Sequence, residues 1–255
     1  MLGQNFNDLS SYIDFLDKIG DLKRIKVEVD PVLEISEISS KTIENEGPAL
    51  LFENVKGSSF PVATNLFGSE ERLRLSLGCN PKELGEEILS FAEKSMPPKL
   101  DNLLQSLPFI KRLTNFRSKE EAFNSPCQQI QDEITLEDLP IIKCWPEDGG
   151  KFITMGLTIT QSPITNKSNM GMYRLQMHDK NKLGMHWHPH KGGAAHFHEA
   201  KQLRKDFPAA IVMGGDPSLI FASKSNSINK SLVHPYTAIF KQVPLSIFAS
   251  SLYSR

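Results

Sequence analysis

The sequence predicts an α+β protein, because hydrophobic periods typical of helices and of strands alternate along it and because its composition is that of a folded protein. Hydrophobic residues make up 39% and charged residues 23% of the 255 residues, which excludes disordered, collagen-like and disulfide-scaffold classes. The formal net charge of −1 gives no overall field that would draw the chain onto nucleic acid or an anionic membrane. The length suggests one large or two modest domains.

Helices and strands are predicted in alternation over the N-terminal half. Apolar residues after Asp8 recur at helical spacing as far as Ile19, and Gly20 stands where a helix C-cap is expected. Further helices are predicted at 31–46, 69–77 and 81–94, and strands at 22–29, 49–52 and 60–67. The proline-containing stretch 95–115 predicts a connector. Residues 1–115 are therefore expected to form a mixed α/β scaffold or lid domain.

A second domain is expected at 116–223, with residues 224–255 as a separate tail. Its predicted strands are 129–135, 152–161, 170–177, 183–190 and 209–213, its predicted helix is 194–205, and a turn is expected at 214–217.

Cysteine usage favours a reducing compartment. The three cysteines are an odd number and form no C-x-x-C pair, unlike a disulfide framework. The N-terminus has neither the basic nor the apolar region of a signal peptide, and no stretch approaches the roughly 18 apolar residues of a membrane span. We expect a cytoplasmic protein, and peripheral association with a membrane stays open.

Histidines are concentrated in one part of the chain. Six of the seven fall within twenty-one positions, namely His178, His186, His188, His190, His196 and His198. If 183–190 is extended, His186, His188 and His190 share one face and Trp187 takes the other. Such a face could hold a divalent metal or an anionic cofactor. The alternative, hydrogen-bonded or surface histidines on an edge strand, is equally compatible with the spacing, and Pro189 would permit it.

Two neighbouring segments carry groups suited to anions and hard cations. Arg174 offers a fork of donors for a carboxylate or phosphate, and Asn169 offers a neutral oxygen to a cation. The glycine pair within 191–195 allows backbone N–H groups to approach a phosphate before the predicted helix. A solvated arginine and two structural turns are the alternatives.

Two long segments, 169–176 (NMGMYRLQ) and 184–196 (GMHWHPHKGGAAH), closely resemble the UbiD family of prenylated-flavin-dependent decarboxylases. Shorter segments resemble the family's pattern in the same order, at 22–30, 47–57, 64–68, 145–150 and 214–217. The resemblance extends over residues 8–223, and motifs of this length make it specific.

The resemblance implies a carboxy-lyase that removes carbon dioxide from a prenylated 4-hydroxybenzoate, or a related aromatic or unsaturated acid, in ubiquinone or menaquinone biosynthesis. It implies prenylated FMN as the cofactor, supplied by a separate flavin prenyltransferase, with Mn²⁺ and often K⁺ at its phosphate. It also implies that the second domain is a flavin-reductase-like split β-barrel. Homo-oligomers are typical of the family, and their assembly uses a further C-terminal domain that is expected to be missing here.

The family's motifs imply roles for individual residues. Arg174 is the expected catalytic residue, facing the substrate carboxylate. Asn169 and His186 are the expected metal ligands, with His188 as the alternative to His186. The expected cofactor-binding residues are Met172, Tyr173, Arg174, His186, Trp187, His188, Lys191 and Gly192.

The C-terminal end departs from the family's pattern, which continues into a glutamate metal ligand and then an acidic proton relay. All 30 Asp and Glu residues lie at or before Asp216. This break predicts a shifted reading frame or a truncated gene, with a divergent tail as the alternative, and a barrel incomplete at its C-terminal end. Because decarboxylation needs a proton donor, we expect impaired or absent activity. A flavin-binding or metal-binding split-barrel protein without catalysis is the alternative function.

Overall fold

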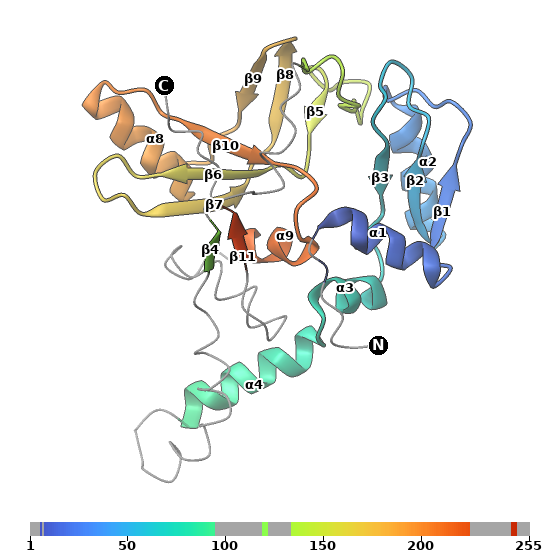
Figure 1. Ribbon diagram of the computed structural model, residues 1–255, viewed down its shortest axis with the longest axis horizontal. Coiled ribbons are helices and arrows are strands. Elements are labelled where there is room, and N and C mark those ends of the chain that lie inside the picture. The colour runs from blue at the N-terminus through green and yellow to red at the C-terminus, as the bar shows by residue number, and fades with distance from the viewer. Residues whose placement is uncertain (1–5, 7, 95–118, 122–133, 225–245, 249–255) are drawn as a thin grey trace.

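The structure is a computed structural model in which residues 6, 8–94, 119–121, 134–224 and 246–248 are described. Its helices and small sheets confirm the α+β prediction (Figure 1). We call residues 8–94 the N-terminal unit and residues 134–224 the C-terminal unit.

The N-terminal unit is built on a three-stranded sheet in the order β1-β2-β3. β1 (Leu22–Ile25) and β2 (Ala49–Phe52) are parallel, which requires the crossover through α2 (Glu34–Glu44), and β3 (Val62–Thr64) is antiparallel to β2. All of β2 is buried, because α1 (Leu9–Lys18) and α2 cover its opposite faces. Ala49 packs with Tyr12 of α1, and Phe52 packs with Ile35 of α2.

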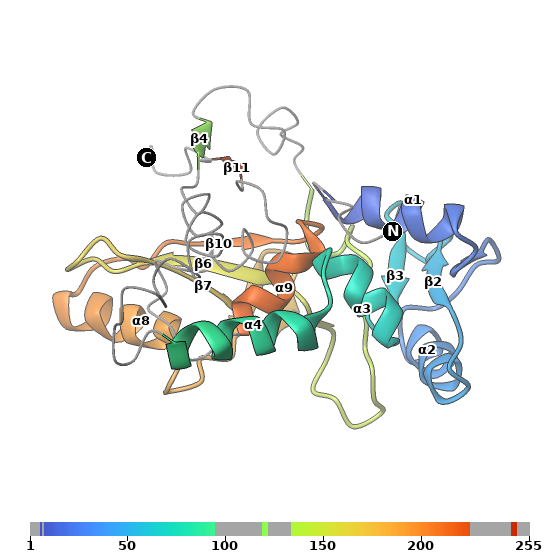
Figure 2. The same cartoon turned by 90° about the horizontal axis from the view of Figure 1, so that it is seen from below.

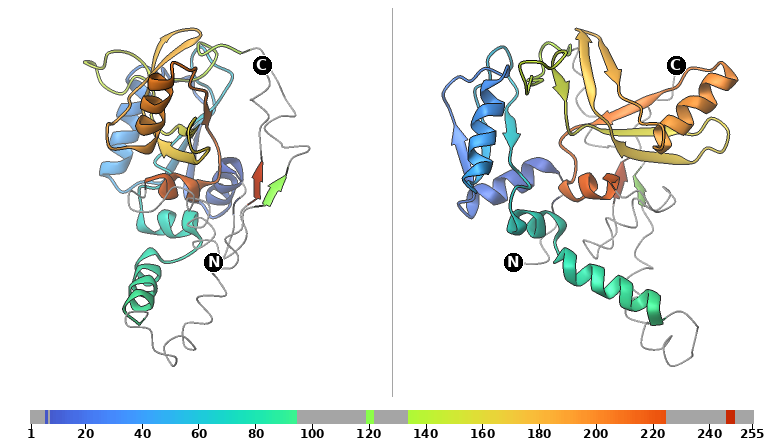
Figure 3. Two further views of the ribbon diagram at one scale, coloured as in Figure 1. Left: turned by 90° about the vertical axis from the view of Figure 1, so that its left-hand side faces the viewer. Right: turned by 180° about the vertical axis from the view of Figure 1, so that it is seen from behind.

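Local signals place most of the N-terminal helices where the sequence predicts them. Asp8 caps α1 by accepting a hydrogen bond from the Ser11 amide at 2.7 Å. α3 (Glu70–Leu77) is capped by Ser69, and α4 (Pro81–Lys94) has the predicted bounds. α4 projects away from the sheet of the N-terminal unit (Figures 1 and 3).

The helix predicted at 31–46 is shorter than expected. α2 begins at Glu34 because Leu33 has a φ of 70° and Val32 forms a parallel bridge to Lys143. This bridge joins the segment before α2 to the C-terminal unit. Because Val32 is extended in the bridge, the helix cannot begin at residue 31.

The C-terminal unit contains two antiparallel three-stranded sheets. One has the order β5-β8-β9, and the other has the order β10-β6-β7. The strands are β5 (Phe152–Ile153), β6 (Leu157–Gln161), β7 (Ser168–Met172), β8 (Leu175–Asp179), β9 (Lys182–Met185) and β10 (Ala209–Val212). The helices are α8 (Gly192–Leu203) and α9 (Pro217–Lys224).

Several predicted strands differ from the observed ones. In the N-terminal unit, β1 ends at Ile25 rather than at residue 29, and β3 spans Val62–Thr64 rather than 60–67. Segment 152–161 divides into β5 and β6, and segment 170–177 divides between β7 and β8, because in each case the chain crosses from one sheet to the other. The strand predicted at 183–190 ends at Met185, where the pairing of β9 with β8 ends. The prediction that His186, His188 and His190 share a strand face is therefore wrong.

Other predictions fall at the edges of the described residues. Segment 129–135 lies largely outside them, and its described residues, Ile134 and Thr135, are not in a strand. Helix α9 was not predicted, although Asp216 caps it by accepting from the Ser218 amide at 2.9 Å and Pro217 suits a first helical position. The connector 95–115 lies outside the described residues. Of the tail, Ser246–Phe248 forms β11, which pairs in parallel with β4 (Lys119–Glu121).

The two units contact each other through α9 and the N-terminal helices (Figure 2). The Phe221 ring on α9 lies edge-on to Phe67 with centroids 5.0 Å apart. The Leu9 amide donates to the Gly214 carbonyl at 2.9 Å. Within the described part of the chain, no helix has both the length and the apolar character needed to cross a membrane.

Candidate functional site

The hairpin β6–β7 has one apolar face and one polar face. Leu157 and Met170 pack against Ala222 of α9 on the apolar face. Strand alternation directs Thr160 and its register partner Asn169 to the opposite face, where α8 lies (Figure 3). The polar face is therefore a buried layer between a hairpin and a helix.

Asn169 lies at the centre of this polar face. Its side chain is 1% exposed, and its Nδ2 donates to Thr160 Oγ1 at 3.4 Å. Its Oδ1 is buried and has no hydrogen-bond partner among the described residues. A buried carbonyl oxygen without a partner is costly, so this atom is suited to a bound cation or donor.

A histidine of α8 completes the layer. His196 is 9% exposed, and its Nδ1 lies 3.1 Å from Thr160 Oγ1. From the sequence, His196 was recognised as part of the histidine cluster but no role was predicted for it, and Thr160 was not predicted as a site residue. The alternation of Thr158, Thr160 and Ser162 along one strand face was the available signal.

Tyr173 joins this hairpin to the start of α8. Its hydroxyl oxygen accepts a hydrogen bond from the Gly193 amide at 2.9 Å. A Cβ on Gly193 would lie 2.5 Å from the Trp187 ring and 2.7 Å from the Tyr173 hydroxyl, and one on Gly171 would lie 2.7 Å from the Tyr173 ring. Both positions require glycine because the aromatic rings approach the backbone closely.

The predicted residue Trp187 lies in an aromatic cluster. Its ring is edge-on to Tyr173 with centroids 5.0 Å apart, and it stacks on Phe197 of α8 at 5.9 Å. Phe207 closes the cluster at 5.8 Å from Trp187. The cluster fixes the path of the chain between β9 and α8.

The first turn of α8 offers backbone donors. Its N-cap, Lys191, has an extended backbone, and the Lys191 side chain makes no capping hydrogen bond. The Gly193 amide already donates to Tyr173, so the other amides of this turn and the helix dipole are what would favour an anion. An anionic group bound at Lys191 and Gly192 would therefore lie at the N-terminus of α8.

Arg174 lies between β7 and β8. Its side chain is exposed, and its guanidinium carbon lies 4.9 Å from the centre of the Phe152 ring. Its backbone carbonyl accepts from the His186 amide at 3.1 Å. The segments 169–174 and 186–193 therefore lie side by side. Asn169 is buried under α8, whereas Arg174 is at the surface.

The remaining predicted residues occupy the rim of this region. Met172 is half-buried at the end of β7, where it pairs with Leu157. His186 and His188 are exposed, as are His178, His190 and His198. Across the described ranges, no three or more His, Cys, Asp and Glu side chains come together as a metal-binding group. The histidine cluster alone therefore does not form a metal centre there.

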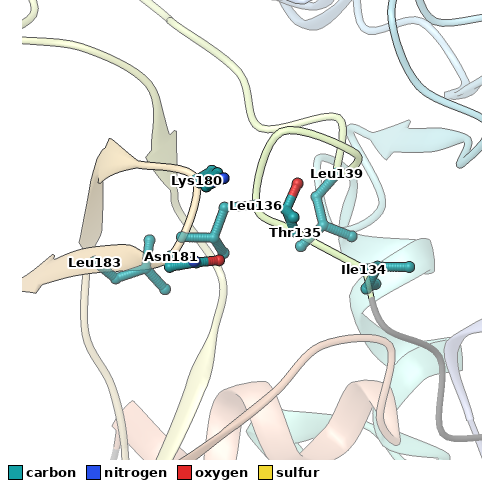
Figure 4. Close-up of a pocket in the computed structure, with 7 residues that line it drawn as sticks. All are labelled: Ile134, Thr135, Leu136, Leu139, Lys180, Asn181 and Leu183. Carbon is teal, nitrogen blue, oxygen red and sulfur yellow. The ribbon is translucent and has the colours of Figure 1, made fainter.

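A cavity of about 390 Å³ lies between the β8–β9 turn and the segment before β5 (Figure 4). Its lining residues are Ile134, Thr135, Leu136, Leu139, Lys180, Asn181 and Leu183. None of them is a carboxylate or an imidazole, and none belongs to the predicted site. The cavity lining therefore offers neither a carboxylate nor an imidazole, and the buried layer around Asn169 remains the candidate site.

Comparison with known proteins identifies the class to which this arrangement belongs. Residues 13–92 match the 3-octaprenyl-4-hydroxybenzoate carboxy-lyase N-terminal domain, and residues 119–235 match the Rift-related domain of the same enzymes. The chain belongs to the UbiD family. The Rift-related match extends past residue 223, where the sequence resemblance was expected to end.

Relatives and solved structures agree with this assignment. An uncharacterized protein of Aquifex aeolicus is 40% identical over 228 residues, which cover 88% of this chain and 47% of the relative. The closed form of vanillic acid decarboxylase from Sedimentibacter hydroxybenzoicus has a TM-score of 0.77 at 25% identity, covering 98% of this chain and 52% of that one. An evolved dimeric form of the UbiD-class enzyme HmfF from Pelotomaculum thermopropionicum, in complex with prFMN, shares the fold with a TM-score of 0.74 at 23% identity, covering 95% of this chain and 52% of that one. The chain thus spans about half the length of these relatives.

Proposed function

We propose that this chain is the flavin-binding and metal-binding part of a UbiD-type decarboxylase acting on a prenylated 4-hydroxybenzoate or a related aromatic or unsaturated acid. The observation that carries the proposal is the buried Oδ1 of Asn169, which has no partner in the described structure. It lies in a polar layer covered by α8, whose N-cap side chain, Lys191, makes no capping hydrogen bond.

The residues present suit a hard cation and a phosphate. Asn169 Oδ1 would supply one neutral oxygen ligand to Mn²⁺, with His186 or His188 as the second protein ligand, and K⁺ would be held nearby. Lys191 and the amide of Gly192 would hold the cofactor phosphate at the start of α8. Met172, Tyr173 and Trp187 would line the flavin. When bound, prenylated FMN would supply the electron sink for cleavage of the bond between the substrate and its carboxyl carbon.

Arg174 would hold the substrate. Its exposed guanidinium lies over the Phe152 ring, which leaves its fork of donors free to pair with a carboxylate in two parallel hydrogen bonds. Such a pair would orient the carboxylate before carbon dioxide leaves. Arg174 is thus the proposed catalytic residue.

Proton delivery is the step that we propose to be weak in this chain. Carbon dioxide leaves without the bonding electrons, so the product carbon must take up a proton. None of the proposed site residues is a carboxylic acid, and no Asp or Glu occurs from Pro217 to Arg255. General acid catalysis is worth roughly 10²–10⁴-fold, so the chain assayed alone should bind its cofactor and release little or no carbon dioxide.

Partners and location follow from the same proposal. A flavin prenyltransferase would supply the cofactor, and the quinone-pathway acid would be the substrate. We propose a cytoplasmic location because the number of cysteines is odd and they form no C-x-x-C pair.

The test is purification of the chain from cells that also produce a flavin prenyltransferase. We expect bound prenylated flavin in the absorbance and mass spectra and Mn²⁺ by elemental analysis. Asn169→Leu should lose the metal, whereas Asn169→Asp should keep it. Protein without flavin would disprove the proposal, and metal without flavin would leave the metal-binding module. Clear carbon dioxide release would contradict the proposed weakness in proton delivery.

A further inference from the structure

A buried series of hydrogen bonds determines which atom of the Asn169 side-chain amide is left without a partner. The chain consists of Asn169 Nδ2, Thr160 Oγ1 and His196 Nδ1, at successive separations of 3.4 and 3.1 Å. It links β7 to β6 and β6 to α8, and all three side chains are at least nine-tenths buried.

The observed positions of these three side chains indicate which atom donates each hydrogen bond. The amide nitrogen of Asn169 can only donate, so the Thr160 oxygen accepts from it. The hydroxyl of Thr160 has one proton of its own, and the acceptor in reach is Nδ1 of His196. If Thr160 donates this proton to His196, His196 is the neutral tautomer that carries its proton on Nε2.

The opposite arrangement would present a different atom. If His196 instead donated from Nδ1, the Thr160 proton would be available to Asn169, and the amide could turn so that Oδ1 accepted it. The NH₂ group would then face the position now occupied by the unpartnered Oδ1, and a donor repels a cation. The amide atom that faces the cation therefore depends on two residues that are not themselves proposed as metal ligands.

We infer that Thr160 and His196 are positioning residues, which hold the Asn169 amide with Oδ1 turned toward a cation. This inference rests on the proposed function, in which that oxygen is a metal ligand. Partners that orient a metal ligand typically contribute 10–100-fold in metal affinity. Thr160 therefore acts on the cation through Asn169 and need not touch it.

Variants of Thr160 and His196 separate this role from simple packing. Thr160→Val keeps the shape and removes the hydroxyl, and Thr160→Ser keeps the hydroxyl. His196→Leu removes the acceptor, whereas His196→Asn places an oxygen near the position of Nδ1. Ser162→Ala is the control, because Ser162 also joins β6 to α8, by a hydrogen bond to Glu199 at 2.5 Å, without touching Asn169.

The first measurement is Mn²⁺ binding to the purified full chain. Electron paramagnetic resonance of the unbound ion monitors the binding. We expect Thr160→Val and His196→Leu to weaken binding by about 10-fold or more. Thr160→Ser, His196→Asn and Ser162→Ala should bind like the wild type. Equal affinity in Thr160→Val and the wild type would overturn the inference while leaving the metal assignment of Asn169 intact.

The second measurement needs no metal. Nitrogen-15 nuclear magnetic resonance should show His196 as the neutral tautomer protonated at Nε2, and Asn169 side-chain amide protons protected from exchange. Both features should be lost in Thr160→Val and kept in Thr160→Ser. A His196 proton on Nδ1 would overturn the inference. Absence of Mn²⁺ binding by the wild type would instead contradict the proposed function, and the resonance data would still decide the orientation.

Discussion

At the scale of single residues, the motif predicted which side chains are neighbours better than it predicted their surroundings. Tyr173 and Trp187 are in ring contact although fourteen positions separate them. The burial of Asn169 and the exposure of Arg174 could not be predicted, because both depend on how α8 covers the hairpin. Thr160 was missed for the same reason, since its importance comes from His196, thirty-six residues away.

Arg72 should be a major contributor to stability. It is 3% exposed, its Nη1 lies 2.8 Å from Asp21 Oδ1, and its Nη2 donates to the Gly47 carbonyl at 3.1 Å. Arg72→Met leaves both acceptors without their donor, so urea unfolding should show a loss of about 1–3 kcal/mol. Arg74→Met, which breaks a surface pair with Glu71 on the same helix, should cost less than about 1 kcal/mol. Equal losses would contradict the role of Arg72.

Tyr12 should make stability depend on alkaline pH. Its buried hydroxyl lies 2.8 Å from the Arg72 carbonyl oxygen, to which it donates, and burial raises the pKa of Tyr12 above its ordinary value of 10.0. The folded protein thus holds this proton more tightly than the unfolded chain. The resulting stability is complete below pH 10 and is lost as the pH rises beyond it.

Tyr12→Phe tests this dependence. At neutral pH the variant should be less stable by about 1–2 kcal/mol, because the carbonyl loses its donor. The difference from the wild type should shrink above about pH 10, since phenylalanine has no proton to lose. Urea unfolding at several pH values measures it, and a difference that stays constant would contradict the prediction.

At the scale of elements, local signals predicted helices well and strands less well. α4 has the predicted bounds because Asn80 and Pro81 mark its start locally, and Asn80 Oδ1 accepts from the Lys82 amide at 3.0 Å. A strand needs a partner, and alternation does not reveal where pairing stops. The segment after Met185 therefore resembled a strand in sequence, yet it leaves β8 and enters the aromatic cluster around Trp187.

Two glycine substitutions in helices should have opposite effects. In α8, Gly193→Ala would place a Cβ 2.5 Å from the Trp187 ring, so thermal unfolding should show a loss of about 1–3 kcal/mol. In α4, a Cβ on Gly85 would meet nothing within 4 Å. Gly85→Ala should therefore stabilise by about 0.5–1 kcal/mol through helix propensity. A tolerated Gly193→Ala would show that the aromatic cluster is not tightly packed.

At the scale of the whole molecule, the hydrophobic periodicity predicted an α+β chain but not how its units are joined. The contact between them uses α9, a helix that the sequence analysis missed, and a bridge from Val32 to Lys143 that shortens α2. Both features are tertiary. A row of rings runs through the contact, with Tyr12 stacked on Phe67 at 6.2 Å and Phe67 edge-on to Phe221.

This row of rings should couple the unfolding of the two units, and Phe221→Ala should weaken the coupling. Both tryptophans, Trp145 and Trp187, lie in the C-terminal unit, so fluorescence reports on that unit while circular dichroism reports on both. In the wild type the two urea transitions should coincide. In Phe221→Ala, the half-buried ring is lost at a cost of about 1–3 kcal/mol, and the transitions should separate. Phe60→Ala, at a side chain 38% exposed, should leave them coincident. Coincident transitions in Phe221→Ala would show that the units are held together by contacts other than this ring.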